Sequence, residues 1–253
     1  MTHRHACGLT LYLALCAGCI ASANVWAANP EPYATWNFQY PGTHTLVWYY
    51  ATRQDYLKNE PNRAVVDDVE FAVTPGVSPP SANSIYLLEY SHVNQGEDVL
   101  DIGTGTGLHA IFAAKKAKRI VATDIAPAAI ANARFNVQRL GLESKIDLRV
   151  GDLFQPLKQG EKFDVIYFNI NFPFSTDPSA RNALHERLFS EVRPHMKPGA
   201  RIYYQTSFIK NFPRIYDMLQ RHHMRIMEMH MAHLTQYRHE PVIMMIQAGA
   251  PER

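Results

Sequence analysis

The chain has 253 residues, of which 47% are hydrophobic and 19% charged, with 13 Gly, 16 Pro and 3 Cys. This balance excludes disordered, collagen-like and coiled-coil proteins, because each requires a strong compositional bias, and three cysteines exclude a small disulfide-rich scaffold. Lys and Arg total 25 against 23 Asp and Glu, so no basic excess indicates a nucleic-acid partner.

Residues 1–27 have the three parts of a secretory signal peptide. Arg4 supplies the positive charge, an apolar run follows over residues 9–20, and Val25 and Ala27 suit a cleavage site. The apolar run is shorter than a bilayer span, so no transmembrane segment is expected. All three cysteines lie in this segment, and a mature chain without cysteine suits an oxidising compartment. We therefore expect export, to the periplasm.

Two other interpretations of the start stay open. The stretch from Cys16 to Cys19 resembles a bacterial lipobox, in which Cys19 carries a lipid anchor, although Cys16 stands where Leu or Val is usual. Alternatively, the segment is not a functional signal and the protein is cytoplasmic. The cytosolic origin of the cofactor inferred below favours this second alternative.

The next segment, residues 28–95, is rich in aromatic residues and ends in a Pro-rich stretch, residues 74–80, that cannot be helical throughout. A segment of this length is marginal as an independent fold. We predict an extension packed on the main domain. Its aromatic side chains either cover an acceptor site or belong to the core.

From Gly96 to residue 253 the apolar pattern alternates between strands and helices. Strands are predicted at 98–102, 119–123, 146–150, 163–168, 201–206, 225–231 and 242–247, with helices at 108–117, 127–140, 178 to about 196, and 208–219. This alternation implies one α/β domain with a doubly wound, mostly parallel seven-stranded sheet. Only a loop separates the last two strands, so they should be antiparallel.

A Gly-rich loop follows the first of these strands and opens a helix, where free backbone N–H groups can meet a ligand. A dinucleotide fingerprint would require glycine at position 108, where Leu108 stands. The pattern Asp-x-Gly-x-Gly-x-Gly instead resembles motif one of the class I S-adenosylmethionine-dependent methyltransferases, which have a Rossmann-like fold. The resemblance implies that the methionine and ribose parts of the cofactor lie against Asp101, Gly103, Thr104, Gly105 and Gly107.

Acidic residues also follow the second and third strands. A carboxylate at Asp124 can accept both ribose hydroxyl protons in charge-assisted hydrogen bonds, and Asp124 matches the family's ribose-binding acid, with Ile125 beside it. Asp152 and Leu153 match the family's adenine-binding positions. The expected cofactor is therefore S-adenosyl-L-methionine, with no metal.

The fourth strand leads into a candidate acceptor motif. Residues 171–174 resemble the Asn-Pro-Pro-Tyr motif of amino-group methyltransferases, with Phe172 in place of the first proline and Phe174 in place of the tyrosine. This alignment makes Asn171, Pro173 and Phe174 the catalytic candidates. A second register, similar to ribosomal-protein methyltransferases, uses Asn169 instead. A third interpretation is that these residues only end the strand.

The motif has a clear physical logic. An amide nitrogen is a poor nucleophile because its lone pair is delocalised, so the enzyme must align it with the methyl group. An asparagine carbonyl can accept an N–H bond of the acceptor, and an aromatic ring can stack on it. Residues 71–79 further resemble the segment before motif one in release-factor glutamine and ribosomal-RNA guanine methyltransferases.

The predicted function is N-methylation of an amide, amine or aromatic amine in a protein or small molecule. Two alternatives are an exported, non-catalytic ligand-binding protein on the same fold and an aminopropyltransferase of the spermidine-synthase type. The latter would usually carry an acid after the fourth strand, where this chain has asparagines.

Methionines and histidines are dense over residues 222–233, and such soft ligands suit copper. In a strand, however, Met227, Met229 and Met231 share one face, where methionines are usually core. No metal site is predicted.

Overall fold

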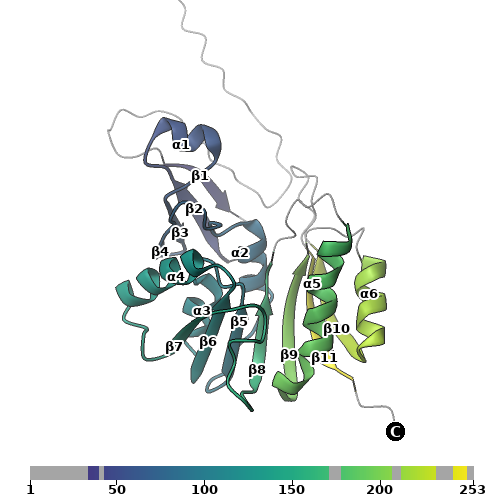
Figure 1. Ribbon diagram of the computed structural model, residues 1–253. Helices are drawn as coiled ribbons and strands as arrows, with labels where there is room; N and C mark the ends of the chain where they lie inside the picture. Colours follow the sequence, from purple (N-terminus) through teal and green to yellow (C-terminus); the bar gives the residue numbers. More distant parts are fainter. Residues whose placement is uncertain (1–33, 40–42, 171–177, 207–211, 232–241, 250–253) are drawn as a thin grey trace, which may run out of the picture.

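The computed structural model describes residues 34–39, 43–170, 178–206, 212–231 and 242–249, and it contains two sheets (Figure 1). The strands of the larger, seven-stranded sheet follow the order β10-β11-β9-β8-β5-β6-β7, and the smaller sheet has the order β1-β2-β3-β4. The predicted signal peptide, residues 1–27, lies outside the described residues. In the parts of the chain that the structure describes, no helix has the length and apolarity that a bilayer crossing needs.

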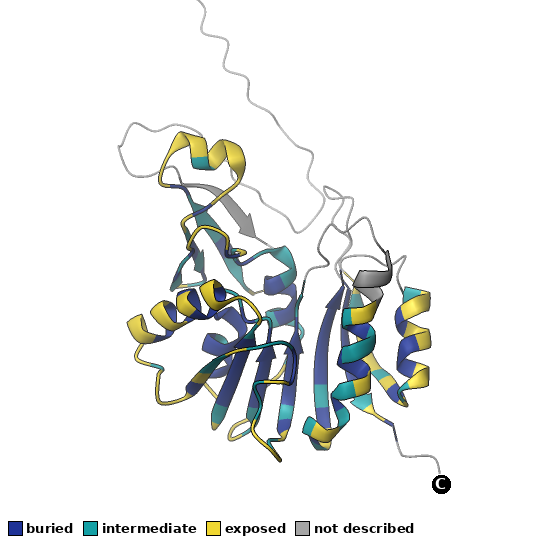
Figure 2. Ribbon diagram, in the orientation of Figure 1, coloured by how far each residue is buried: buried dark blue, intermediate teal, exposed yellow. Residues whose placement is uncertain are grey.

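The larger sheet confirms the predicted fold class. Its strands are β5 (Asp98–Ile102), β6 (Arg119–Asp124), β7 (Ile146–Val150), β8 (Phe163–Phe168), β9 (Met196–Thr206), β10 (Met224–Met231) and β11 (Val242–Ala248). The first five run parallel, and β11 lies antiparallel between β9 and β10. The strands β5 and β8 are almost wholly buried, as parallel strands covered on both faces should be (Figure 2).

Helices cover both faces of this sheet. One buried cluster joins the sheet to α2 (Ala82–Glu89), α3 (Leu108–Ala113) and α4 (Pro127–Arg139) through side chains such as Tyr86, Ile111 and Val137. The other joins it to α5 (Pro178–Glu191) and α6 (Phe212–Arg221) through side chains such as Leu188 and Ile215. The two apolar layers hold the carboxyl ends of the parallel strands at one edge of the molecule.

Two predicted boundaries are wrong at β9. The helix α5 ends at Glu191, and a 3-10 turn over Arg193–His195 leads directly into the strand. The strand begins at Met196, which pairs with Phe163, rather than at Arg201. A register irregularity follows, so residues 197–200 have no partners in β8. Pro198 lacks an N–H, and Gly199 has a φ of +77°, so both residues fit a stretch that is not paired with β8.

The N-terminal region is a small antiparallel sheet that sequence reasoning did not identify. Its strands are β1 (Ala34–Gln39), β2 (Thr45–Tyr49), β3 (Arg63–Val66) and β4 (Val69–Ala72), with α1 (Arg53–Lys58) between β2 and β3. Thr52 and Asp55 form a capping box at the start of α1, and Asn59 ends it in the left-handed conformation. The sheet stands above the larger one in Figure 1.

Two buried asparagines of α4 attach this sheet to the main domain. The Oδ1 atom of Asn136 accepts from the backbone N–H of Ala72 at 2.8 Å, and its Nδ2 donates to the carbonyls of Ala72 and Thr106. Asn132 accepts from the backbone N–H and the hydroxyl of Thr74. The Pro-rich stretch that follows is therefore fixed above the main sheet.

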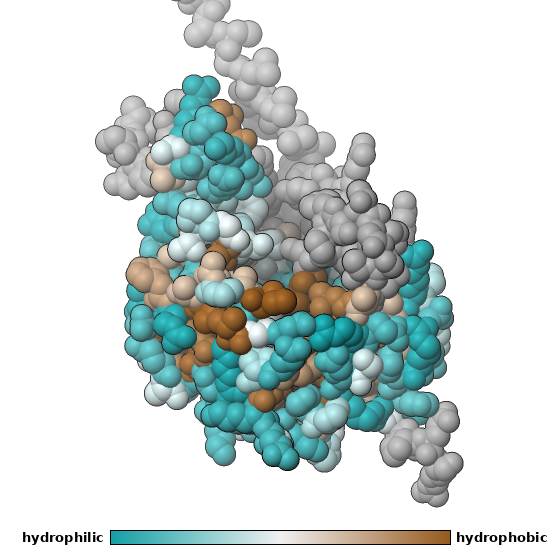
Figure 3. Space-filling model, viewed as in Figure 1, coloured by the Kyte–Doolittle hydropathy of each residue, from teal (hydrophilic) through white to brown (hydrophobic). Residues whose placement is uncertain are grey.

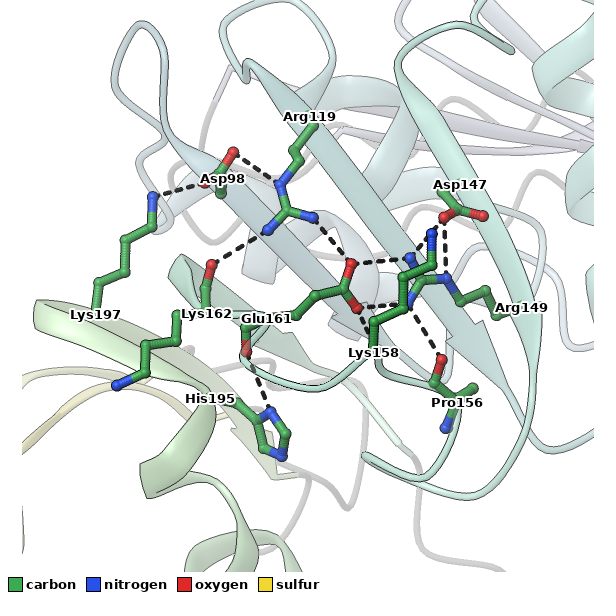
Figure 4. Close-up of polar contacts among 10 residues, drawn as sticks. All are labelled: Asp98, Arg119, Asp147, Arg149, Pro156, Lys158, Glu161, Lys162, His195 and Lys197. Atoms are coloured by element: carbon green, nitrogen blue, oxygen red, sulfur yellow. Dashed lines mark hydrogen bonds and ion pairs between the residues drawn. The ribbon is translucent and has the colours of Figure 1, made fainter.

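A network of ion pairs joins β7 to the amino ends of β5, β6 and β8 (Figure 4). The Glu161 carboxylate accepts from Arg149 Nη1 at 2.6 Å and from Arg119 Nη1 at 3.1 Å. These guanidinium groups lower the pKa of Glu161 to about 2. Asp98 pairs with Arg119 and with Lys197, so charges from several segments neutralise one another here.

Candidate cofactor and acceptor site

A cavity of about 370 Å³ lies at the carboxyl ends of β5, β6, β7 and β8. Ligands bind at this edge in doubly wound sheets. Its lining residues come from the loops after these strands, from α4 and α5, and from the Pro-rich stretch, and they include Val77, Ser78, Gly103, Gly105, Asp124, Ile125, Asp152, Leu153, Asn169 and Ile170. Hydrophobic surface gathers across the middle of the face seen in Figure 3, below the N-terminal sheet.

The loop after β5 requires its glycines. Gly103, Gly105 and Gly107 have φ angles of +76°, +54° and +88°, which side-chain-bearing residues rarely adopt. A Cβ at Gly103 would lie 2.7 Å from Cγ1 of Ile170. The sharp turn is held because the backbone N–H groups of residues 103 and 104 both donate to the carbonyl of Thr123. The loop thus brings bare backbone to the cavity wall.

Asp124 is partly exposed at the end of β6, and the structure places it in the cavity wall as the sequence predicts. Its Oδ2 accepts from the backbone N–H of Gly105 at 3.0 Å, and its Oδ1 accepts from that of Ala126 at 2.9 Å. A carboxylate oxygen can accept more than one hydrogen bond. Both oxygens are therefore oriented and retain capacity for hydroxyl donors.

Asp152 and Leu153 also line the cavity, beyond β7. Leu153 is buried and has a φ of +46°, an uncommon conformation for leucine. One oxygen of Asp152 accepts from Nη1 of Arg187 at 2.7 Å, a contact that sequence reasoning missed. Because Arg187 belongs to α5, this ion pair connects the predicted adenine side of the cavity to the helix that follows residues 171–177.

Three predicted cofactor residues, Asp101, Thr104 and Gly107, are not among the residues that line the cavity. The Asp101 side chain is fully buried, its Oδ2 accepts from the Thr104 hydroxyl at 2.7 Å, and its Oδ1 lies 4.0 Å from Nδ1 of His109. Burial raises the pKa of Asp101 and lowers the pKa of His109. In this arrangement Asp101 supports the loop.

Asn169 follows β8 directly and lines the cavity. Its Nδ2 donates to the hydroxyl of Ser84 at 3.2 Å. Its Oδ1 is buried and has no hydrogen-bond partner among the described residues, and the same holds for Oγ1 of Thr123. A buried acceptor without a partner is costly, so it indicates a donor that a bound molecule would supply. The other acceptor candidates, Asn171, Pro173 and Phe174, lie outside the described residues.

These residues fit an adenosyl cofactor. The cavity volume falls within the usual range for small-molecule sites. A glycine loop admits close approach, Asp124 can accept from a diol, and Ile125, which is 69% exposed, offers an apolar surface for a purine. Together, the fold and the site define a Rossmann-like protein that binds a nucleoside.

Comparison with known proteins refines this class. A methyltransferase domain model matches residues 99–199. A Methanocaldococcus jannaschii protein, named provisionally as a protein N5-glutamine methyltransferase, is 33% identical over 150 residues, which cover 53% of this chain and 74% of that protein. The release factor glutamine methyltransferase of Clostridium acetobutylicum is 35% identical over 131 residues, 46% of each chain. The chain belongs to the class I S-adenosylmethionine-dependent methyltransferases.

A solved structure supports the fold. The ribosomal protein L11 methylase of Lactobacillus delbrueckii subsp. bulgaricus matches with a TM-score of 0.54 at 22% identity, over 66% of this chain and 78% of that one. At this identity the likeness concerns the fold alone. The chain spans less than half the length of the release-factor relatives that it matches.

The methionines near the end contradict the expectation that they are core. Met227, Met229 and Met231 are 53%, 43% and 42% exposed. The reason is that β10 is the edge strand and carries a bulge between Ile226 and Glu228. Within the described part of the chain, no group of three or more His, Cys, Asp or Glu could hold a metal ion.

Proposed function

We propose that this protein transfers a methyl group from S-adenosylmethionine to an amide nitrogen, with Asn169 orienting the acceptor. The observation that carries the proposal is that Asn169 lines the same cavity as the glycine loop and Asp124, and that its buried Oδ1 has no partner among the described residues. We name the side-chain amide of a glutamine residue as the first acceptor to test, since five relatives carry names that refer to glutamine.

The residues around the cavity have separable roles in this proposal. When bound, S-adenosylmethionine supplies a methyl group on a positively charged sulfur. Asp124 would accept from the ribose hydroxyls, and the apolar side chains of Ile125 and Leu153 would lie against the adenine. Asp152 would accept from the adenine amino group while Arg187 holds its carboxylate in place.

Asn169 would act on the acceptor. Its Oδ1 accepts one N–H of the acceptor amide, which fixes the nitrogen so that its lone pair points along the transfer direction. Alignment matters here because the amide lone pair is delocalised and the free amide seldom presents it. Directly after β8 stand Asn169 and Ile170, and neither offers the charge with which an aminopropyltransferase would hold a polyamine.

The test is transfer of radiolabelled methyl from S-adenosylmethionine to a glutamine-containing peptide by the full chain. We expect Asn169→Ala to lower the transfer rate by about 100-fold, as loss of an oriented hydrogen-bonding group does, while cofactor affinity changes less than about threefold. Asn94→Ala, at an exposed asparagine, is the matched control. Transfer by Asn169→Ala at the wild-type rate would contradict the role of Asn169.

We also propose export to the periplasm through residues 1–27, which rests on the sequence pattern alone. The test is fractionation of Gram-negative cells that express the full chain, with N-terminal sequencing of the product. A periplasmic protein that begins at residue 28 supports the proposal. An intact N-terminus in the cytoplasm contradicts it, and a lipid-modified Cys19 would show anchoring instead.

A further inference from the structure

Ser84 connects the N-terminal part of the chain to the proposed acceptor site. It lies in the first turn of α2 and is 8% exposed. Its hydroxyl accepts from Nδ2 of Asn169 at 3.2 Å, although the two residues are 85 positions apart. Neither the glycine loop nor the acceptor motif includes it, and it is not a cavity-lining residue.

The hydrogen bonds of Ser84 restrict what its hydroxyl can offer. A serine hydroxyl has two lone pairs and one proton. The backbone N–H of Ser81 donates to it at 3.2 Å, and Asn169 donates to it as well. Its other hydrogen-bonding neighbour among the described residues is the hydroxyl of Ser81, at 3.3 Å. With both lone pairs taken by N–H donors, the proton points to Ser81, so the group that meets Asn169 is an acceptor.

An acceptor at this position determines the orientation of the Asn169 amide. The Nδ2 end turns toward Ser84, and the Oδ1 end of this cavity-lining residue is left buried without a partner among the described residues. The reverse orientation would place an NH₂ group where Oδ1 now lies, opposite the N–H groups of the proposed acceptor amide. Two donors cannot pair, so the reversed side chain could not hold the acceptor.

Ser84 is itself held in place. Its carbonyl accepts from Nε2 of His109 at 3.2 Å, and His109 is buried at the start of α3, directly after the glycine loop. The His109 ring also stacks on Tyr167, whose centroid is 5.3 Å away and which lies two residues before Asn169. The start of α2 is therefore fixed to both the cofactor loop and β8.

We propose that Ser84 is a positioning residue that keeps the Asn169 amide oriented with its carbonyl toward the acceptor. This inference rests on the proposed function, because it gives Ser84 a role in methyl transfer through Asn169. It implies that the site selects acceptors with an N–H to donate.

The first test is a double-mutant cycle with the full chain, S-adenosylmethionine and the glutamine-containing peptide. We expect Ser84→Ala to lower kcat by about tenfold, the worth of one hydrogen bond, and to leave the KM for S-adenosylmethionine unchanged within about twofold. The effect should vanish in an Asn169→Ala background, and Ser84→Thr, which retains a hydroxyl, should restore most of the rate.

Ser91→Ala is the matched control, because Ser91 also joins the α2 region to β8, through Tyr167 at 3.1 Å, but lies outside the cofactor cavity. We expect it to leave kcat unchanged. A tenfold fall for Ser84→Ala that persists in the Asn169→Ala background would overturn the inference, since Ser84 would then act independently of Asn169.

A second measurement does not depend on transfer. In ¹⁵N-labelled full chain, the side-chain NH₂ signal of Asn169, assigned by its absence from Asn169→Ala, should exchange with water about tenfold more slowly in wild type than in Ser84→Ala. Equal exchange overturns the inference. Slow exchange in a protein that never methylates the peptide leaves the inference standing and overturns only the proposed acceptor chemistry.

Discussion

The two ends of the large sheet differ in how completely their polar groups are paired. At the amino ends, Glu161 is paired with Arg119 and Arg149, and Asp98 with Lys197. At the carboxyl ends, Oδ1 of Asn169 and Oγ1 of Thr123 are buried without partners among the described residues. Charges are paired at both ends, as Asp152 and Arg187 show at the carboxyl ends, but these two buried atoms without partners lie at the carboxyl ends. The difference indicates which end is built to meet a ligand.

The largest expected effect concerns Asn136, whose side chain is fully hydrogen-bonded beside the glycine loop. Asn136→Ala would leave the backbone N–H of Ala72 and the carbonyl of Thr106 buried without their hydrogen-bond partner. We expect the free energy of unfolding to fall by about 4 kcal/mol. Denaturant titration measures it. A loss as small as that of Asn94→Ala, at an exposed asparagine, would show that the N-terminal sheet does not depend on this contact.

The amino end should respond to acid. Because Arg149 and Arg119 lower the pKa of Glu161 to about 2, ionised Glu161 stabilises the fold above its usual pKa of 4.5. That contribution, about 2–3 kcal/mol, is lost as the pH falls from about 5 to about 2. Glu161→Gln should remove it at pH 7 and flatten the stability curve in that window. The affinity of Glu161→Gln for S-adenosylmethionine should equal that of the wild type. A lower affinity would contradict the idea that the amino ends of the sheet do not contribute to cofactor binding.

Gly103→Ala tests the glycine loop. We expect a loss of about 2 kcal/mol in unfolding free energy, from the left-handed backbone and from crowding against Ile170 at 2.7 Å. Gly160→Ala is a matched control, since Gly160 has a φ of +77° and open space around it. The control should lose about half as much unfolding free energy as Gly103→Ala. Its affinity for S-adenosylmethionine should equal that of the wild type, whereas Gly103→Ala should bind S-adenosylmethionine more weakly. Equal losses for the two variants would argue against the crowding.

The smallest effect concerns the edge strand. Met229 and Met244 are cross-strand partners, but Met229 is 43% exposed and Met244 is fully buried. We expect Met229→Ala to change the unfolding free energy by less than about 0.5 kcal/mol and Met244→Ala to lower it by about 3 kcal/mol. Comparable losses would mean that Met229 is covered in solution.

The sequence predicts the central strands well. The bounds of β5, β7 and β8 agree with the prediction, because β5 and β8 are short, mostly apolar runs and β7 alternates apolar with charged residues. The N-terminal sheet was missed because its four strands are short, although Trp36 and Phe38 alternate with Asn37 and Gln39 in the first of them. The exposure of Met229 was also missed, since a face of a strand is core only when another element covers it, and β10 lies at the edge.

The site shows the same limit. Motif spacing placed Asp124, Asp152 and Asn169 around one cavity, because parallel strands end at one edge. It could not exclude Asp101 from the cavity lining, nor find Ser84 and Arg187, whose contacts join distant segments. A Ser-x-x-Ser pattern at residues 81–84 signals a helix start, but nothing local links that start to β8.

The central claim is that the carboxyl ends of the parallel strands bind S-adenosylmethionine and its acceptor. Calorimetric titration of the full chain with S-adenosylmethionine tests the first half most directly. We predict binding that Asp124→Ala weakens by at least about 100-fold and that Asp68→Ala, at an exposed turn, leaves unchanged. A folded wild-type protein that does not bind, or an Asp124→Ala variant that binds equally well, would contradict the account.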